Sequence, residues 1–156
     1  MRRIRLAAFI GLMFLSNAFL AQNDIKKIDG HYFTTEGQLF SGVYTTEYEN
    51  GHTKEAYSIS EGLLSGPIKQ YYSNGALKEQ GQYINGNKDG QWYTWAPNGK
   101  KTAEAFYNKG EKDSTWVIWD EKGTKRFETF YKDGERTGNW KMWDDSGDLI
   151  SEKVYK

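Results

Sequence analysis

Short stretches in which aromatic and polar residues alternate recur along the chain from residue 41 to the C-terminus. Each is about six or seven residues long and is bounded by glycine, a pattern that predicts β-strands joined by tight turns. The pattern repeats every 24 residues without an insertion, in units that begin at residues 42, 66, 90, 114 and 138. We therefore predict an all-β fold, a single-layered antiparallel meander of about five tandem β-hairpins.

Three series of glycines follow this period. One opens each unit, with Ser114 in the remaining place, a second follows nine residues later, and a third precedes the next unit. Asn-Gly favours a two-residue type I′ turn, because both residues tolerate positive φ. We expect such a turn at Asn98-Gly99 and its equivalents, and a looser turn between units. The glycines with these expected structural roles are Gly66, Gly75, Gly86, Gly90, Gly99, Gly110, Gly123, Gly134, Gly138 and Gly147.

The aromatic residues lie on the same period, with tryptophan at the third and sixth positions of the last three units and tyrosine near the end of the second strand. Equivalent tryptophans would lie about 10 Å apart, whereas favourable ring pairs lie about 4.5–7 Å apart. The tyrosines must therefore fill the gaps. The aromatic residues with this expected structural role are Trp92, Trp116, Trp140, Tyr83, Tyr107 and Tyr131.

The predicted turn also sets the register between the two strands of a unit. A two-residue loop at Asn98-Gly99 places Trp92 opposite Ala105 and Trp95 opposite Thr102. In the next unit the corresponding pairs are Trp116 with Thr129 and Trp119 with Arg126. Strand alternation places the third and sixth positions on opposite faces, but a β-bulge would bring both tryptophan rows to one face. The sequence leaves both arrangements open.

The sixth-position aromatic row, with charged residues of the following strands, is the candidate binding surface. Flat aromatic rings give large contact areas at low entropic cost, which suits protein or sugar recognition. The alternative is that these rings only cover one another in a sheet without a second layer. The candidate surface comprises Tyr71, Trp95, Trp119, Trp143, Arg126, Glu104 and Glu128.

The pattern from Gly90 to Gly110 reads G-x-W-x-x-W-x-x-N-G, then Y and G at the spacing of the other units. It resembles the MORN-variant repeat, a β-hairpin module of bacterial proteins labelled YwqK-family antitoxins, and the resemblance extends from about Ser41 to the last residue. It implies a non-enzymatic, elongated array with a protein partner. MORN repeats in other settings are linked to contact with membrane lipids or proteins.

The N-terminus has a different character. Arg2, Arg3 and Arg5 precede an apolar run and small residues near Ala18 and Ala21, which is typical of a secretory signal peptide. The alternative is a membrane anchor, although the apolar run is short for a span of roughly 20 residues. We thus divide the chain into a signal at 1–21, a polar lead and degenerate cap half-repeat at 22–40, and five repeats at 41–156. The signal predicts a bacterial periplasmic, outer-surface or secreted protein without a stable membrane span after its removal.

Composition narrows the chemistry. The 21 basic and 21 acidic side chains balance, which argues against nucleic-acid binding, and there is no cysteine. His31 and His52 stand in the lead and beside a turn, and the aspartates around Gly147 lack the remainder of a calcium loop. We expect no catalytic, cofactor or metal site. The sequence favours an exported module that binds a protein, and the alternative is a module that binds glycan or cell wall through exposed aromatic rows.

Overall fold

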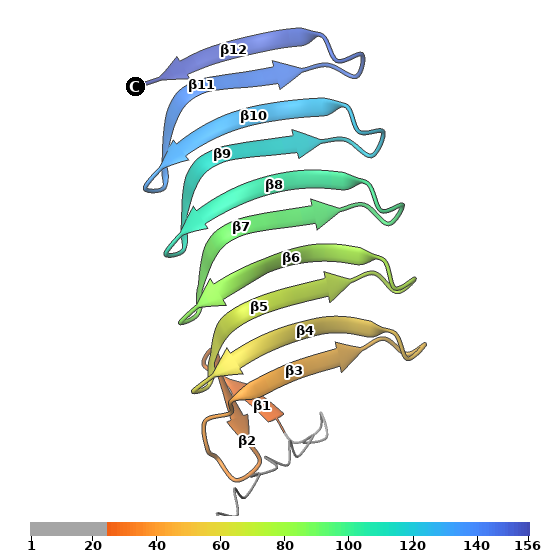
Figure 1. The fold of residues 1–156 in the computed structure, drawn as a ribbon, viewed down its shortest axis with the longest axis vertical. Coiled ribbons are helices and arrows are strands. Elements are labelled where there is room, and N and C mark those ends of the chain that lie inside the picture. The colour runs from red at the N-terminus through yellow and green to blue at the C-terminus, as the bar shows by residue number, and fades with distance from the viewer. Residues whose placement is uncertain (1–24) are drawn as a thin grey trace, which may run out of the picture.

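The computed structural model describes residues 25–156, which form a ten-stranded antiparallel sheet and a two-stranded hairpin (Figure 1). The predicted signal at 1–21 lies outside the described residues. The hairpin consists of β1 (Ile25–Ile28) and β2 (His31–Thr34). The sheet consists of β3 (Gly42–Glu47), β4 (Thr53–Ser60), β5 (Leu63–Tyr71), β6 (Leu77–Ile84), β7 (Asn87–Trp95), β8 (Lys101–Asn108), β9 (Glu111–Trp119), β10 (Lys125–Lys132), β11 (Glu135–Trp143) and β12 (Leu149–Tyr155).

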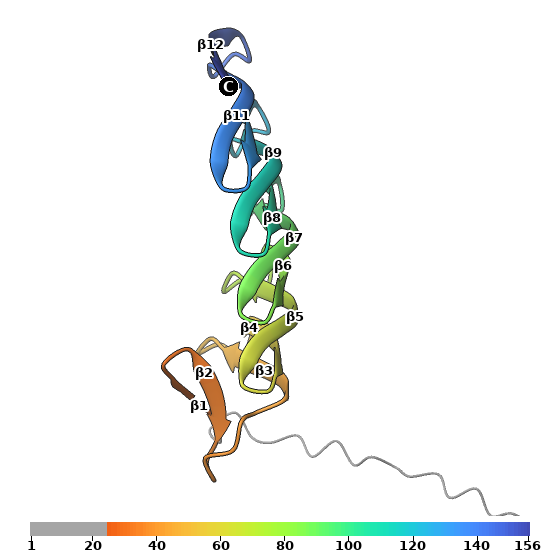
Figure 2. The same cartoon turned by 90° about the vertical axis from the view of Figure 1, so that its left-hand side faces the viewer.

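The order of strands in the sheet follows their order in the chain, from β3 at one edge to β12 at the other. Seen from the side, the sheet is a thin ribbon without a second layer (Figure 2). The prediction of a single-layered meander of five hairpins is therefore confirmed. Within residues 25–156, no helix is long and apolar enough to cross a membrane.

The two kinds of turn are the reverse of those predicted. Between units, Asn85 and Gly86 have φ values of 47° and 81°, and Ile84 pairs with Asn87, so this is the two-residue type I′ turn. The same pair of positive φ values occurs at Glu61-Gly62, Lys109-Gly110 and Asp133-Gly134. Strand twist favours this turn even where the first residue is not asparagine.

Within a unit the loop has three residues, so the expected type I′ turn at Asn98-Gly99 is wrong. Gly99 N–H donates to the Ala96 carbonyl at 2.9 Å, and Ala96 N–H donates to the Lys100 carbonyl at 2.8 Å. Only Gly99 has a positive φ, of 79°. Pro97 fixes a negative φ that suits a type I turn, and the glycine closes the loop in a bulge.

The longer loop changes the register next to it. Trp92 pairs with Ala105 and Trp116 pairs with Thr129, as predicted, because both pairs lie away from the turn. The register slips by one residue nearer the turn, so Trp95 pairs with Lys101 and Trp119 with Lys125. The predicted partners of Trp95 and Trp119, which were Thr102 and Arg126, are therefore wrong.

The glycine that opens each unit lies at a bulge. Between β8 and β9 the pairing passes from Glu104–Val117 to Phe106–Asp113, which leaves extra residues on β9 around Ser114. The corresponding Gly66, Gly90 and Gly138 all have positive φ. Strands β5, β7, β9 and β11 curve strongly near their starts, next to the turns between units (Figure 1). Backbone bending is therefore the reason for this glycine series.

Ser114 is the one non-glycine residue in this series, and its φ is 57°. A left-handed conformation costs an L-residue roughly 1–2 kcal/mol. We expect Ser114→Gly to raise the free energy of unfolding by about 1 kcal/mol, after loss of the Ser114 hydroxyl bond to Asp113. Urea denaturation measures this gain, and Ser65→Gly on β5 is the control at a position without a positive φ. A loss of stability in Ser114→Gly would contradict the prediction.

Buried side chains form two clusters, one at the N-terminal end of the array and one toward the middle of the sheet. Tyr32, Phe40 and Ile59 make up the first, which joins the β1–β2 hairpin to the sheet. Ile68, Trp92 and Ala105 make up the second. Residues 25–28, placed in the polar lead by the sequence, are thus a strand of a hairpin that covers the β3 end of the sheet (Figure 2).

Candidate binding surfaces

The two tryptophan rows lie on opposite faces of the sheet. Trp95 has its ring 5.9 Å from that of Tyr93, the residue that follows Trp92 and points the other way. We call the face with Trp92, Trp116 and Trp140 the ladder face. The opposite face, with Trp95, Trp119 and Trp143, is the ion-pair face. The bulge near the turn does not bring the rows together.

Aromatic rings on the ladder face form one continuous series in which tyrosine and tryptophan alternate. Six consecutive ring pairs have centroid separations between 4.9 and 6.0 Å. The order of the series is Tyr83, Trp92, Tyr107, Trp116, Tyr131, Trp140 and Tyr155. These separations suit tilted and edge-to-face packing, and they confirm that the tyrosines fill the gaps between tryptophans.

Trp92 is the most deeply placed ring of the series, with 3% of its surface exposed. Its indole packs directly against Gly81, where an added Cβ would lie 2.3–2.7 Å from three atoms of the indole. The indole N–H of Trp92 is buried without an acceptor. By contrast, Trp116 and Trp140 donate to the carbonyls of Phe106 and Phe130 at 3.0 Å.

We expect Gly81→Ala to turn the Trp92 ring into the orientation of Trp116, which packs near Ala105. The Gln82 carbonyl stands one repeat before that of Phe106, so the turned indole gains an acceptor. Overpacking by the added methyl group costs about 1–3 kcal/mol. The new hydrogen bond from the Trp92 indole contributes about 0.5–1.5 kcal/mol, and replacing glycine by alanine reduces the conformational entropy of the unfolded chain. Together these two effects offset most of the cost. The free energy of unfolding should change by less than about 1 kcal/mol, and near-UV circular dichroism should report the ring movement. A loss above about 3 kcal/mol would show that the ring cannot turn.

Basic side chains lie over the rings of the ladder. Lys112 Nζ is 4.5 Å from the Trp116 centroid and 4.9 Å from that of Tyr131. Arg136 lies 4.8 Å from the centroid of Trp140. Lys88 and Lys153 cover Trp92 and Tyr155 in the same way. Each pair of rings therefore carries a cation at cation–π distance.

The tyrosine pKa values reflect a change along the ladder. Burial raises the pKa of Tyr83 and Tyr107, near the middle of the sheet. At the C-terminal edge the pKa of Tyr155 is lowered, because Lys153 and then Arg136 stabilise its phenolate. The C-terminal end of the ladder is thus open and electropositive.

The ion-pair face carries rings covered by lysine–glutamate pairs. Lys101 pairs with Glu104 at 2.5 Å and places its Nζ 4.6 Å from the centroid of Tyr93, beside Trp95. One unit later, Lys125 pairs with Glu128, and its Nζ lies 4.8 Å from the Trp143 centroid. Lys141 and Glu152 continue the row at 3.7 Å. The face is therefore a flat mixture of half-buried rings and ion pairs.

Arg126, which the sequence placed on the candidate surface, lies at the row of hairpin turns. Its Nε donates to the Trp143 carbonyl at 3.0 Å, and its guanidinium contacts Asp120 and Asp145. In earlier units Tyr48 donates its hydroxyl in the same manner to the carbonyl of Tyr71, at 2.8 Å. Arg126 and the Tyr71 backbone therefore hold neighbouring units together. The remaining candidate residues, Trp95, Trp119, Trp143, Glu104 and Glu128, share the ion-pair face.

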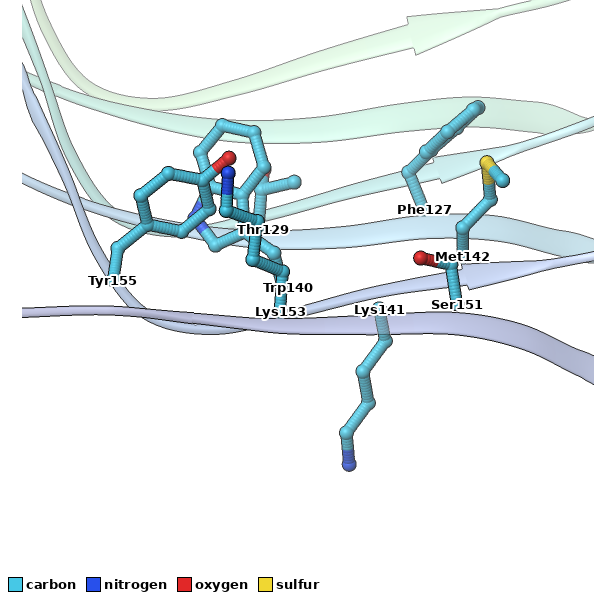
Figure 3. A pocket seen from close by; sticks show the side chains of 8 residues that line it. All are labelled: Phe127, Thr129, Trp140, Lys141, Met142, Ser151, Lys153 and Tyr155. Carbon is cyan, nitrogen blue, oxygen red and sulfur yellow. The ribbon is translucent and has the colours of Figure 1, made fainter.

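A hollow of about 240 Å³ at the C-terminal end of the ladder face was not predicted. Figure 3 shows Trp140, Lys153 and Tyr155 at one end and Phe127 and Met142 at the other, while Lys141 extends to the opposite side of the sheet. Phe127 was assigned no role, because phenylalanine does not recur at its position in other units. Comparison of that position across the units would have shown that Phe127 is the only large apolar residue there.

No constellation for chemistry is evident within residues 25–156. In that part of the chain, no three His, Asp or Glu side chains form a group that could hold a metal ion. His52 lies at a hairpin turn, where its Nδ1 is 2.7 Å from the Ser73 carbonyl of the next unit. Its contact is structural, like the neighbouring Asn50 amide bond to the same carbonyl.

Comparisons with known proteins agree with the repeat period. The MORN repeat variant model matches residues 64–85, 88–109 and 136–156. No curated protein gives a significant match. A crystal structure of the GtfA/B complex bound to UDP and GlcNAc is 13% identical, with 81% of this chain and 27% of that chain covered, and its TM-score of 0.29 carries no functional argument. Three of the five hairpins of this chain, β5–β6, β7–β8 and β11–β12, therefore match the MORN repeat variant model.

Proposed function

We propose that this chain is a non-enzymatic, exported module that binds another protein. The observation that carries the proposal is the ion-pair face, on which the rings of Tyr93 and Trp143 lie under lysine amines that also pair with glutamates. A flat face of half-buried rings and satisfied charges suits a protein interface, in which aromatic anchors are surrounded by polar groups. Sugar stacking needs bare rings, and here the amines lie over them.

Export rests on the signal-like residues 1–21. The resemblance to YwqK-family antitoxins supports an antitoxin-like role, and export supports a scaffold for envelope components. Both are binding roles outside the cytoplasm, and the identity of the partner distinguishes them. N-terminal sequencing of the protein recovered from the periplasm or medium of a bacterial host tests export. An intact Met1 on protein retained in the cytoplasm would contradict it.

Affinity capture tests the binding role. Residues 22–156 serve as bait for an envelope extract, and the Trp95→Ala and Trp119→Ala variants serve as baits altered only on the ion-pair face. We expect a protein to be captured by the parent and lost from both variants. Recovery of glycan alone, with loss from the same variants, would replace the proposal with a glycan-binding function.

A further inference from the structure

The C-terminal end of the ladder face exposes apolar side chains that the fold does not require. Ile118 and Phe127 are 43% and 39% exposed, and they pair across β9 and β10. Met142, on β11, pairs with Phe127, so the three strands β9, β10 and β11 contribute to one patch. We call Ile118, Phe127 and Met142, with the adjoining Trp140 and Tyr155, the C-terminal patch.

The same positions in the first two units, β3–β4 and β5–β6, are polar. Glu79 stands two repeats before Phe127 and forms an ion pair with Lys88 at 3.3 Å, and Gln70 stands two repeats before Ile118. The hairpins of these units form without an apolar residue at either position. An apolar pair at 118 and 127 is therefore not needed for strand pairing. Its exposure indicates a contact with another molecule.

The cations around the patch lack carboxylate partners. Lys112, Arg136 and Lys153 lie over ladder rings, and none of them makes an ion pair with another residue in the described part of the chain. In the same row Lys88 does have a partner, Glu79. The patch is thus apolar and positively charged, and it suits a ligand that is apolar and negatively charged.

The other end of the ladder face is covered by polypeptide from this chain. Tyr32 of the β1–β2 hairpin is 3% exposed, and its ring lies 5.4 Å from that of Tyr44 on β3. Ile59 and Leu64 complete this contact. An extended segment with aromatic and branched apolar side chains is therefore known to fit this face.

We infer that the C-terminal patch binds an extended, acidic polypeptide segment of a partner protein through its apolar and aromatic side chains. This inference goes beyond the proposed function, because it assigns a second binding surface, on the opposite face of the sheet from the ion-pair face, and names the chemistry of the segment bound there. Apolar side chains of the segment enter the hollow between Phe127, Trp140 and Met142, and its carboxylates meet Arg136 and Lys153. Equivalent cations one unit apart are separated by about 10 Å, roughly three residues of extended chain.

Peptide binding to the purified full-length protein tests this inference. The probe is a short synthetic peptide with glutamate at every third residue and isoleucine or tyrosine between, labelled for fluorescence anisotropy. We expect it to bind, and we expect Phe127→Glu and Arg136→Gln each to weaken binding at least tenfold. Glutamate occupies the position of Phe127 in β6, so the hairpin tolerates it, and far-UV circular dichroism checks the fold of both variants.

Three controls separate the alternatives. Trp95→Ala, on the ion-pair face, should bind the acidic peptide as the parent does. A peptide with lysine in place of glutamate should bind at least tenfold more weakly. Equal binding of the two peptides, or no effect of both patch variants, overturns the inference, as does binding to phosphatidylglycerol vesicles without binding to the acidic peptide. Loss of capture from the ion-pair-face variants bears on the proposed function alone, whereas failure of the acidic peptide to bind overturns this inference and leaves the proposed function standing.

Discussion

Replacement of Trp92 by alanine should lower the free energy of unfolding by about 3–5 kcal/mol, the cost of emptying a large aromatic site in a core. The ring is 3% exposed and belongs to the cluster that also contains Ile68 and Ala105. Its ring centroid lies 5.3 Å from that of Tyr83 on one side and 6.0 Å from that of Tyr107 on the other, and both pairs are edge-to-face. A single-layered sheet has no second layer to refill the cavity, so little of this loss can be recovered.

Trp95→Ala is the matched control for this prediction. The two rings lie three residues apart in the same strand, but Trp95 is half-buried on the opposite face and has no place in either core cluster. We expect it to cost about 1–2 kcal/mol. Urea denaturation followed by far-UV circular dichroism gives both values. Equal losses in the two variants would show that the ladder does not carry the core.

The sequence predicted the period, the strand number and the order of the sheet, because turn glycines and ring positions repeat together. It did not predict which turn takes which form. Asn-Gly at 98–99 is a strong signal for a type I′ turn on local grounds, but a type I turn closed by a glycine bulge also suits a hairpin. That three-residue loop forms at the equivalent turn of all five units, with or without a preceding proline. Conversely, Lys109-Gly110 adopts the type I′ turn without asparagine, because strand twist imposes it.

The candidate site was predictable in part. The ring rows were predictable from the period, and Glu104 and Glu128 lie beside rings of the predicted row. Whether the two rows share a face was left open, because a bulge at the turn could have brought them together. Lys101 and Lys125, which complete that face, were missed because the bulge at the turn rotates them toward it. Gly81 does not belong to the glycine period, so nothing in the sequence singled it out. The Trp92 indole packs directly against it, and this contact between two strands is not encoded in any local pattern.

Replacement of Gly62 by alanine should cost about 2–4 kcal/mol, because two penalties act at the same atom. Gly62 has a φ of 77°, which strains any residue with a Cβ. The added Cβ would also lie 2.6 Å from Leu39 Cδ2 and 3.2 Å from the Tyr32 carbonyl. The clash falls where Tyr32 N–H donates to the Gly62 carbonyl and Gly62 N–H donates to the Phe40 carbonyl, both at 2.8 Å.

Gly99→Ala separates the two penalties. Gly99 has nearly the same φ, 79°, but nothing lies within 4 Å of the position its Cβ would take. It should therefore show the backbone strain alone, about 1–2 kcal/mol. The excess in Gly62→Ala measures how firmly the β1–β2 hairpin is held against the sheet, and hydrogen exchange at the Tyr32 and Phe40 amides should rise in that variant only. If the two variants lose equal stability, the Leu39 side chain and the β1–β2 hairpin move away from the added Cβ without cost. The hairpin would then be held only loosely against the N-terminal end of the ladder face.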